Sequence, residues 1–118
     1  MNQTIALKPA GQIVLDLVDT INENRAYLSE IDGAIGDGDH GINMSKGFTL
    51  CGDALRAEPQ LPGLAEGLDA LAMTLLEGIG GSMGPLYGSF FMGLAEPLAG
   101  QDTLDAELFG EALVSGVA

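Results

Sequence analysis

Apolar residues recur at a helical period along almost the whole chain, and this pattern restricts the possible folds more than any other feature. A helix is expected over residues 10–23, and another over about residues 64–79. The second carries a regular apolar stripe formed by Leu64, Leu68, Leu71, Leu75 and Ile79. No stretch alternates apolar and polar residues for long enough to indicate a strand. The sequence therefore predicts an all-α fold.

A further helix is expected between these two, from about residue 41 to residue 57, where the Glu58-Pro59 pair ends it. Its inward positions are expected to be Met44, Phe48, Cys51 and Leu55. Residues 27–31 are expected to continue the first helix after a break near residues 22–24. A loop rich in aspartate and glycine follows and leads to the helix that begins at about residue 41.

Two more helices are expected in the last third of the chain. Pro85 suits the first turn of one, which ends near Pro97. Thr103 is the expected N-cap of the other, which has no recognisable stop before Ala118. About five antiparallel helices then form an up-and-down bundle. Residues 1–118 are interpreted as a single, incomplete domain.

Composition excludes several classes of function. The formal charge is −13, which argues against binding nucleic acid or an anionic membrane through a basic surface. No apolar run is long enough to span a membrane, and the first residues resemble neither a signal peptide nor a transit peptide. The lone cysteine, Cys51, is interpreted as a small buried hydrophobic residue. A cytoplasmic protein is expected.

Residues 32–44 concentrate acidic and glycine residues in one short segment. Asp32, Asp37 and Asp39 lie within eight positions of one another and are interleaved with glycines. Carboxylates held ~5 Å apart repel by about 3 kcal/mol per pair at an effective dielectric constant near 20. A hard cation such as Mg²⁺ or Ca²⁺ would relieve this repulsion. The alternatives are a solvated turn and an EF-hand, but the EF-hand fails because its twelfth position is Phe48 instead of glutamate.

A second glycine-rich turn occupies residues 78–84 and precedes the helix that contains Pro85. Its backbone N–H groups, at Gly80, Gly81, Ser82 and Met83, could bind an anion at a helix N-terminus. Tight packing between helices is the alternative. Helix directions in an up-and-down bundle bring both special segments to one end. A metal on one side and amide groups on the other would form a site for metal-bound nucleotide phosphates.

Residues 35–44 (Ile-Gly-Asp-Gly-Asp-His-Gly-Ile-Asn-Met) and 80–88 (Gly-Gly-Ser-Met-Gly-Pro-Leu-Tyr-Gly) together resemble the nucleotide-binding L subunit of dihydroxyacetone kinases. The resemblance spans nearly the whole chain but only about the first half of that family's domain. It implies a closed barrel of amphipathic antiparallel helices, with Mg²⁺ and ADP or ATP bound by loops at one end. It also implies phosphoryl transfer to a keto-sugar held on a separate K subunit, with ATP or a phosphotransferase-system phosphocarrier (M subunit) as donor.

The resemblance implies a role for individual residues. Asp32, Asp37 and Asp39 match the Mg²⁺ ligands. The residues that match nucleotide contacts are His40, Gly41, Ile42, Asn43, Gly81, Ser82 and Met83. The family often has serine where this chain has Met83. No covalent nucleophile is expected in this chain, and His40 is alternatively a hydrogen-bond donor that orders its own loop.

Two other readings of the same residues stay open. One is a binding or regulatory module that keeps the fold without turnover, motivated by Met83 and the missing half. The other is a fatty-acid-kinase nucleotide domain, against which His40 and the Gly-Pro-Leu-Tyr-Gly run argue. Because half a barrel would expose the apolar faces of its helices, self-association of the chain is also expected.

Overall fold

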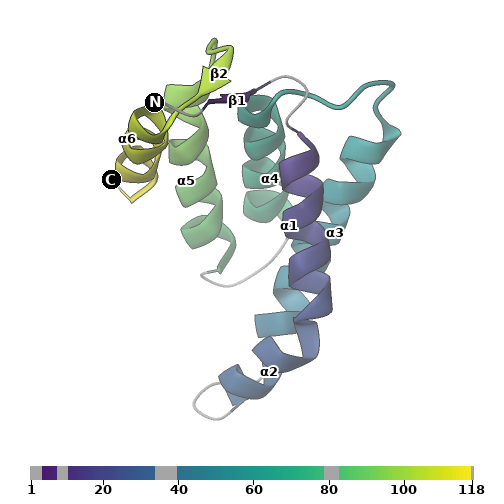
Figure 1. The fold of residues 1–118 in the computed structure, drawn as a ribbon. Coiled ribbons are helices and arrows are strands. Elements are labelled where there is room, and N and C mark those ends of the chain that lie inside the picture. Colours follow the sequence, from purple (N-terminus) through teal and green to yellow (C-terminus); the bar gives the residue numbers. More distant parts are fainter. Residues whose placement is uncertain (1–3, 8–10, 34–39, 79–82, 118) are drawn as a thin grey trace.

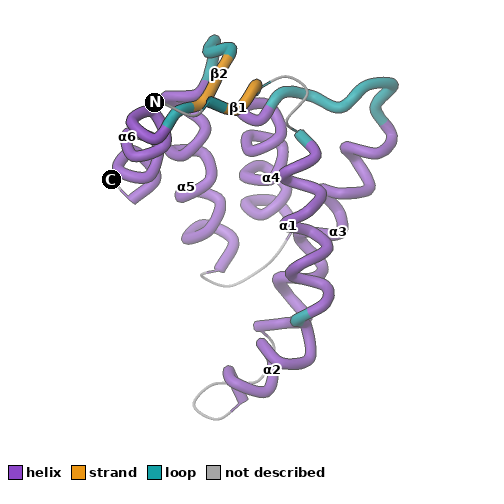
Figure 2. The backbone as a smooth tube through the Cα atoms, in the orientation of Figure 1, coloured by secondary structure: helices purple, strands orange, loops and turns teal. Residues whose placement is uncertain are grey.

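The computed structural model describes residues 4–7, 11–33, 40–78 and 83–117 (Figure 1). Its elements are β1 (Ile5–Ala6), α1 (Gln12–Glu23), α2 (Arg25–Gly33), α3 (His40–Ala57), α4 (Leu64–Gly78), α5 (Met83–Ala95), a short 3₁₀ turn (Glu96–Leu98), β2 (Thr103–Leu104) and α6 (Ala106–Val117). Figure 2 shows helices almost everywhere in the part described. The predicted all-α fold is confirmed, and none of the helices described is long and apolar enough to cross a membrane.

The helices form a chain of neighbours that runs from α6 through α5 and α4 to α3. Helix α4 packs against α5 and α3, α6 packs against α5, and α1 and α2 both pack against α3 (Figure 1). Helix α5 comes close to α4 at Gly88, where an added Cβ would lie 2.6 Å from Cγ of Leu76. The missing side chain therefore permits a close approach of α5 to α4.

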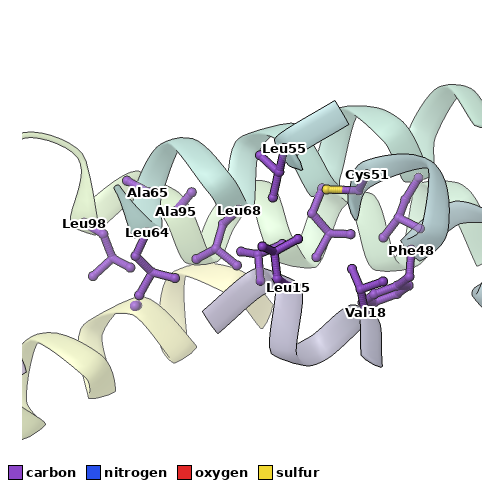
Figure 3. Packing of buried hydrophobic residues seen from close by; sticks show 14 of the residues in the cluster. Leu15, Val18, Phe48, Cys51, Leu55, Leu64, Ala65, Leu68, Ala95 and Leu98 are labelled. Atoms are coloured by element: carbon purple, nitrogen blue, oxygen red, sulfur yellow. The ribbon is translucent and has the colours of Figure 1, made fainter. Parts of the chain in front are cut away.

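The core follows the predicted apolar stripes. Leu55 of α3 and Leu68 of α4 are buried near Leu15 of α1, and Val18 of α1 lies beside Phe48 of α3 (Figure 3). All four inward positions expected in α3 are buried, as are the first four of the stripe in α4, namely Met44, Phe48, Cys51, Leu55, Leu64, Leu68, Leu71 and Leu75. Ile79, the last residue of the predicted stripe, lies outside the described residues. Burying these side chains is the main force that holds the helices together.

The end of α1 and the start of α2 bear on the break that the sequence predicted in the first helix. The break predicted near residues 22–24 is confirmed, because α1 ends at Glu23 and a separate helix, α2, begins at Arg25. The described part of the chain therefore has six helices, one more than predicted. Asn24 closes α1, since its side-chain amide donates to the carbonyl oxygen of Thr20 at 2.9 Å.

The expected N-cap at Thr103 was wrong. Thr103 belongs to β2, where it pairs with Ala6 of the antiparallel strand β1. Asp105 caps α6 instead, because its Oδ1 accepts the backbone N–H of Leu108 at 2.8 Å. This is the bond from an N-cap side chain to the third helical residue, and aspartate makes it as well as threonine does.

Candidate functional site

Two segments outside the described residues separate the helices that the sequence places at the site. Residues 34–39 connect α2 to α3, and residues 79–82 connect α4 to α5. The helix ends that flank them are Gly33, His40, Gly78 and Met83. All four lie on the same side of the molecule, opposite the β1–β2 pair (Figure 1). The predicted helix directions are therefore confirmed by the described ends.

The two pairs of helix ends are offset along α3. Gly78, the last residue of α4, lies beside Leu50, because an added Cβ would come within 3.2 Å of Leu50 Cδ1. Leu50 is ten residues after His40, which corresponds to about 15 Å along a helix axis. Helix α3 therefore extends beyond α4 on the site side, and α2 packs on this extension (Figure 1).

The first turn of α3 contains four of the residues that the sequence assigned to the nucleotide, His40 to Asn43. The first N–H groups of a helix have no partner within it, and the helix dipole makes this end attractive to anions. Within the turn, Gly41 is buried, Asn43 is half-buried and Ile42 is 51% exposed. Asn43 therefore has both a polar side chain and partial access to solvent.

Gly41 also has a packing role that the sequence analysis did not identify. A Cβ at this position would collide with the backbone carbonyl of Arg25 in α2 and would lie 2.6 Å from Ser29 Oγ. That hydroxyl oxygen is itself buried, and no hydrogen-bond partner is found for it among the residues described. Only glycine allows α2 and α3 to cross this closely. The sequence alone does not reveal this packing role, because a glycine in the Asp-His-Gly run is explained equally well by a turn.

A polar contact joins α1 to α3 just beyond the first turn. Asn22 Oδ1 accepts a hydrogen bond from Ser45 Oγ at 2.5 Å and another from Thr49 Oγ1 at 3.3 Å. The Asn22 amide nitrogen lies 3.1 Å from the same Thr49 oxygen. Sequence reasoning missed this cluster, although Ser45 and Thr49 are four residues apart and therefore lie on one face of α3.

The structure places only some of the residues predicted to bind metal or nucleotide. Asp32 is half-buried in the last turn of α2. The backbones of His40 and Met83 begin α3 and α5. The four that lie outside the described residues are Asp37, Asp39, Gly81 and Ser82. Across the ranges that are described, no group of three His, Cys, Asp or Glu side chains could hold a metal ion. The metal site stays a prediction.

Clear pKa shifts occur in the described chain at Cys51 and Asp69, both away from these helix ends. Burial raises the pKa of the Cys51 thiol to about 11. Burial, followed by the nearby charge of Glu66, raises the pKa of Asp69. Neither group belongs to the candidate site, which consists of backbone amides, Asn43 and the aspartates next to them.

Comparison with known proteins agrees with the motifs. The family model described as the DAK2 domain matches residues 34–118. The chain is 45% identical over 87 residues to the PTS-dependent dihydroxyacetone kinase, ADP-binding subunit DhaL, of Lactococcus lactis subsp. lactis (strain IL1403), covering 74% of this chain and 44% of that protein. It is 35% identical over 94 residues to the PEP-dependent dihydroxyacetone kinase, ADP-binding subunit DhaL, of Escherichia coli (strain K12), covering 75% and 42%.

A larger protein matches over a smaller share of its length. The chain is 38% identical over 80 residues to Triokinase/FMN cyclase of Homo sapiens, covering 68% of this chain and 14% of that protein. The chain spans about half the length of the bacterial relatives that it matches.

Proposed function

The chain belongs to the DAK2 domain family, and we propose that it is the nucleotide- and Mg²⁺-binding part of a dihydroxyacetone kinase, or of a kinase for a related ketose. The observation that carries the proposal is the first turn of α3. It begins with the residues His40 to Asn43 and follows an aspartate-rich segment. The bacterial relatives matched over these residues are named as ADP-binding subunits.

We assign the nucleotide phosphates to the helix ends on the site side. The first amides of α3 have no partner within the helix and suit an anion, and so does the start of α5, where Met83 follows Gly81 and Ser82. A protein of charge −13 needs such a local device to bind a polyanion. Because α3 extends past α4, a nucleotide that contacts both segments would lie along the first half of α3.

The residues present suit Mg²⁺ as the metal. Asp32 lies in the last turn of α2, and Asp37 and Asp39 follow it within seven positions, so the donors are all carboxylate oxygens. Mg²⁺ prefers oxygen ligands and shares them with phosphate groups. When bound, it would neutralise charge on the phosphoryl group. The aspartates would hold it, and the α3 amides and Asn43 would orient the phosphates.

The reaction proposed is transfer of a phosphoryl group to a hydroxyl oxygen of a keto-sugar. The donor's P–O bond breaks, and a new P–O bond forms to the sugar. We place the sugar and its activation on a separate K subunit, so no residue here is assigned a catalytic role. The donor is exchangeable ATP, or bound ADP rephosphorylated by a phosphocarrier. Positioning and charge neutralisation then account for the contribution of this chain.

A binding or regulatory module without turnover is the second candidate. It is favoured by Met83, which stands at the first position of α5 where serine is frequent in the family. A module of this kind would bind ADP without supporting phosphoryl transfer when a K subunit is added. Self-association is a separate prediction, motivated by the exposed Phe109, Val114 and Val117 of α6. Light scattering at micromolar concentration tests it.

Calorimetric titration of ADP, with and without Mg²⁺, tests the proposed site. The unmodified chain should bind ADP more tightly with Mg²⁺, and the Asp37→Ala/Asp39→Ala variant should lose that dependence. Asp16→Ala/Asp102→Ala is the matched control, because it removes two negative charges from exposed positions of α1 and of the turn before β2. Equal binding by both double variants would contradict the assignment of the metal ligands.

A further inference from the structure

We propose that Asn22 is a positioning residue for the nucleotide site. Through Ser45 and Thr49 it fixes where the first turn of α3 lies, and it thereby sets the affinity for nucleotide. The inference rests on the proposed function, because it concerns the same turn. It adds a residue of α1 that lies outside both glycine-rich segments.

The contact is short and directional. Ser45 Oγ donates to Asn22 Oδ1 at 2.5 Å, and the Asn22 amide nitrogen lies 3.1 Å from Thr49 Oγ1. Ser45 is only 9% exposed, whereas Asn22 is exposed in the last turn of α1. One side chain on α1 thus holds two consecutive turns of α3.

Apolar packing holds these helices together, but it restricts small displacements less sharply than directional hydrogen bonds do. Val18 of α1 meets the Cys51 and Phe48 region of α3 (Figure 3), and contacts of this kind are non-directional. A displacement of α3 along its axis by about 1.5 Å, without rotation, would leave much of the apolar surface buried. The same displacement would break the bonds to Asn22, because hydrogen bonds weaken steeply with distance and angle.

The contact lies close to the residues whose position matters. Ser45 is two residues after Asn43, about 3 Å along the axis. Helix α2 begins at Arg25, three residues after Asn22, and its Arg25 carbonyl contacts Gly41. Asn22 therefore stands where the chain leaves α1, turns into α2 and meets α3. Losing its amide would remove a polar support of the first turn of α3 and leave the Gly41 crossing and the buried Met44 to hold it.

A positioning role and a stabilising role predict different results. Water can replace the exposed Asn22 amide, so its removal should lower the melting temperature little. Water cannot replace the constraint that the Asn22 hydrogen bonds place on the position of the first turn of α3. Asn24→Ala is the matched control, because the Asn24 amide also sits at the end of α1 but, among the described residues, donates to Thr20 of the same helix.

The experiment measures ADP affinity in the presence of Mg²⁺ beside the melting temperature of each variant. Asn22→Ala and Thr49→Val should weaken ADP binding about fivefold, the equivalent of one net hydrogen bond of ~1 kcal/mol. Thr49→Ser should restore it, since it keeps the hydroxyl. Hydrogen exchange at residues 42–49 should quicken in Asn22→Ala and not in Asn24→Ala.

The outcomes separate the two proposals. ADP binding that is equal in all variants would overturn the positioning role and leave the proposed function standing. Affinity that falls only in proportion to melting temperature, in Asn24→Ala as much as in Asn22→Ala, would also overturn it. No ADP binding by the unmodified chain would overturn the proposed function and this inference with it.

Discussion

Helices α4 and α2 both pack on α3, yet they are held there in different ways. Helix α4 has fifteen residues, seven of them buried, and it also packs against α5 and α1. Helix α2 has nine residues, none of them buried, and among the described elements its main neighbour is α3. Apolar burial therefore accounts for the position of α4. A close backbone contact at Gly41 accounts for much of the position of α2.

This difference implies that α2 and α4 differ in local stability. Segments with few buried apolar contacts open at lower free energy than the core around them. Tyr27 and Ile31 of α2 are 60% and 50% exposed, whereas Leu71 and Leu75 of α4 are fully buried. The helix that leads into the aspartate-rich segment is thus attached most weakly. Binding a ligand there would order it further, and the following predictions test this contrast.

The largest effect is expected in α4. Leu71→Ala removes a fully buried side chain and leaves a cavity, so the free energy of unfolding should fall by about 2–5 kcal/mol. Met73→Ala is the control, because Met73 is two residues away in the same helix and is 46% exposed. It should change the free energy of unfolding by less than about 1 kcal/mol. Urea unfolding measures both. Similar losses in the two variants would mean that α4 does not form the core as described.

The next largest effect concerns pH and the middle of α3. The Cys51 thiol is fully buried, and its pKa is raised from 9.0 to about 11. The unfolded chain then ionises first, so stability falls as pH rises from about 9 to 11. The loss at pH 11 is at most about 2–3 kcal/mol, from 1.4 kcal/mol per pKa unit.

Urea unfolding across this pH range measures the effect, and Cys51→Ala removes the cysteine's share of it. Labelling with a thiol reagent at pH 8 should be limited by unfolding. Labelling of the native protein as fast as a free thiol would contradict the burial of Cys51.

A smaller, local effect is expected at Gly41. Gly41→Ala places a methyl group against the Arg25 carbonyl, so α2 should be pushed away from α3 at a cost of about 1–3 kcal/mol. Hydrogen exchange in α2 should quicken while α4 stays protected. Gly110→Ala is the matched control in α6, because its added Cβ meets no atom within 4 Å. That variant should be neutral or slightly stabilised. Equal exchange in α2 for both variants would show that the crossing is not tight.

The same contrast explains what the sequence could predict. Leu64, Leu68, Leu71 and Leu75 were found because burial imposes a helical period that is visible in one dimension. The cap at Thr103 was mistaken because either Thr103 or Asp105 satisfies the local rule, and the pairing of Thr103 with the distant Ala6 decided between them. Local sequence signals predict where helices lie. Where two residues could equally cap a helix, contacts between distant segments decide which one does.

The site was predictable in a different way. Its residues were assigned from motif resemblance, and four of them lie outside the part of the chain that the structure describes, so the assignment stays a prediction. Asn22 and Ser45 were not found, because their meeting depends on how α1 crosses α3. Gly41 was assigned to phosphate contact alone, since nothing local reveals that Arg25 of α2 passes over it. What sequence reasoning missed at this end is the contact between helices.

The smallest effect is expected at Arg56, which also bridges α1 and α3. Its guanidinium lies 3.8 Å from carboxylate oxygens of Asp19 and Asp53, and these side chains are 49–70% exposed. Water and salt screen pairs of this kind, so Arg56→Ala should lower the free energy of unfolding by less than about 1 kcal/mol, and less again at high salt. Hydrogen exchange at residues 42–49 should not change. If Arg56→Ala quickened exchange there as Asn22→Ala is expected to, charge would be holding α1 against α3 instead of directional hydrogen bonds. The distinction between the two residues would then be lost.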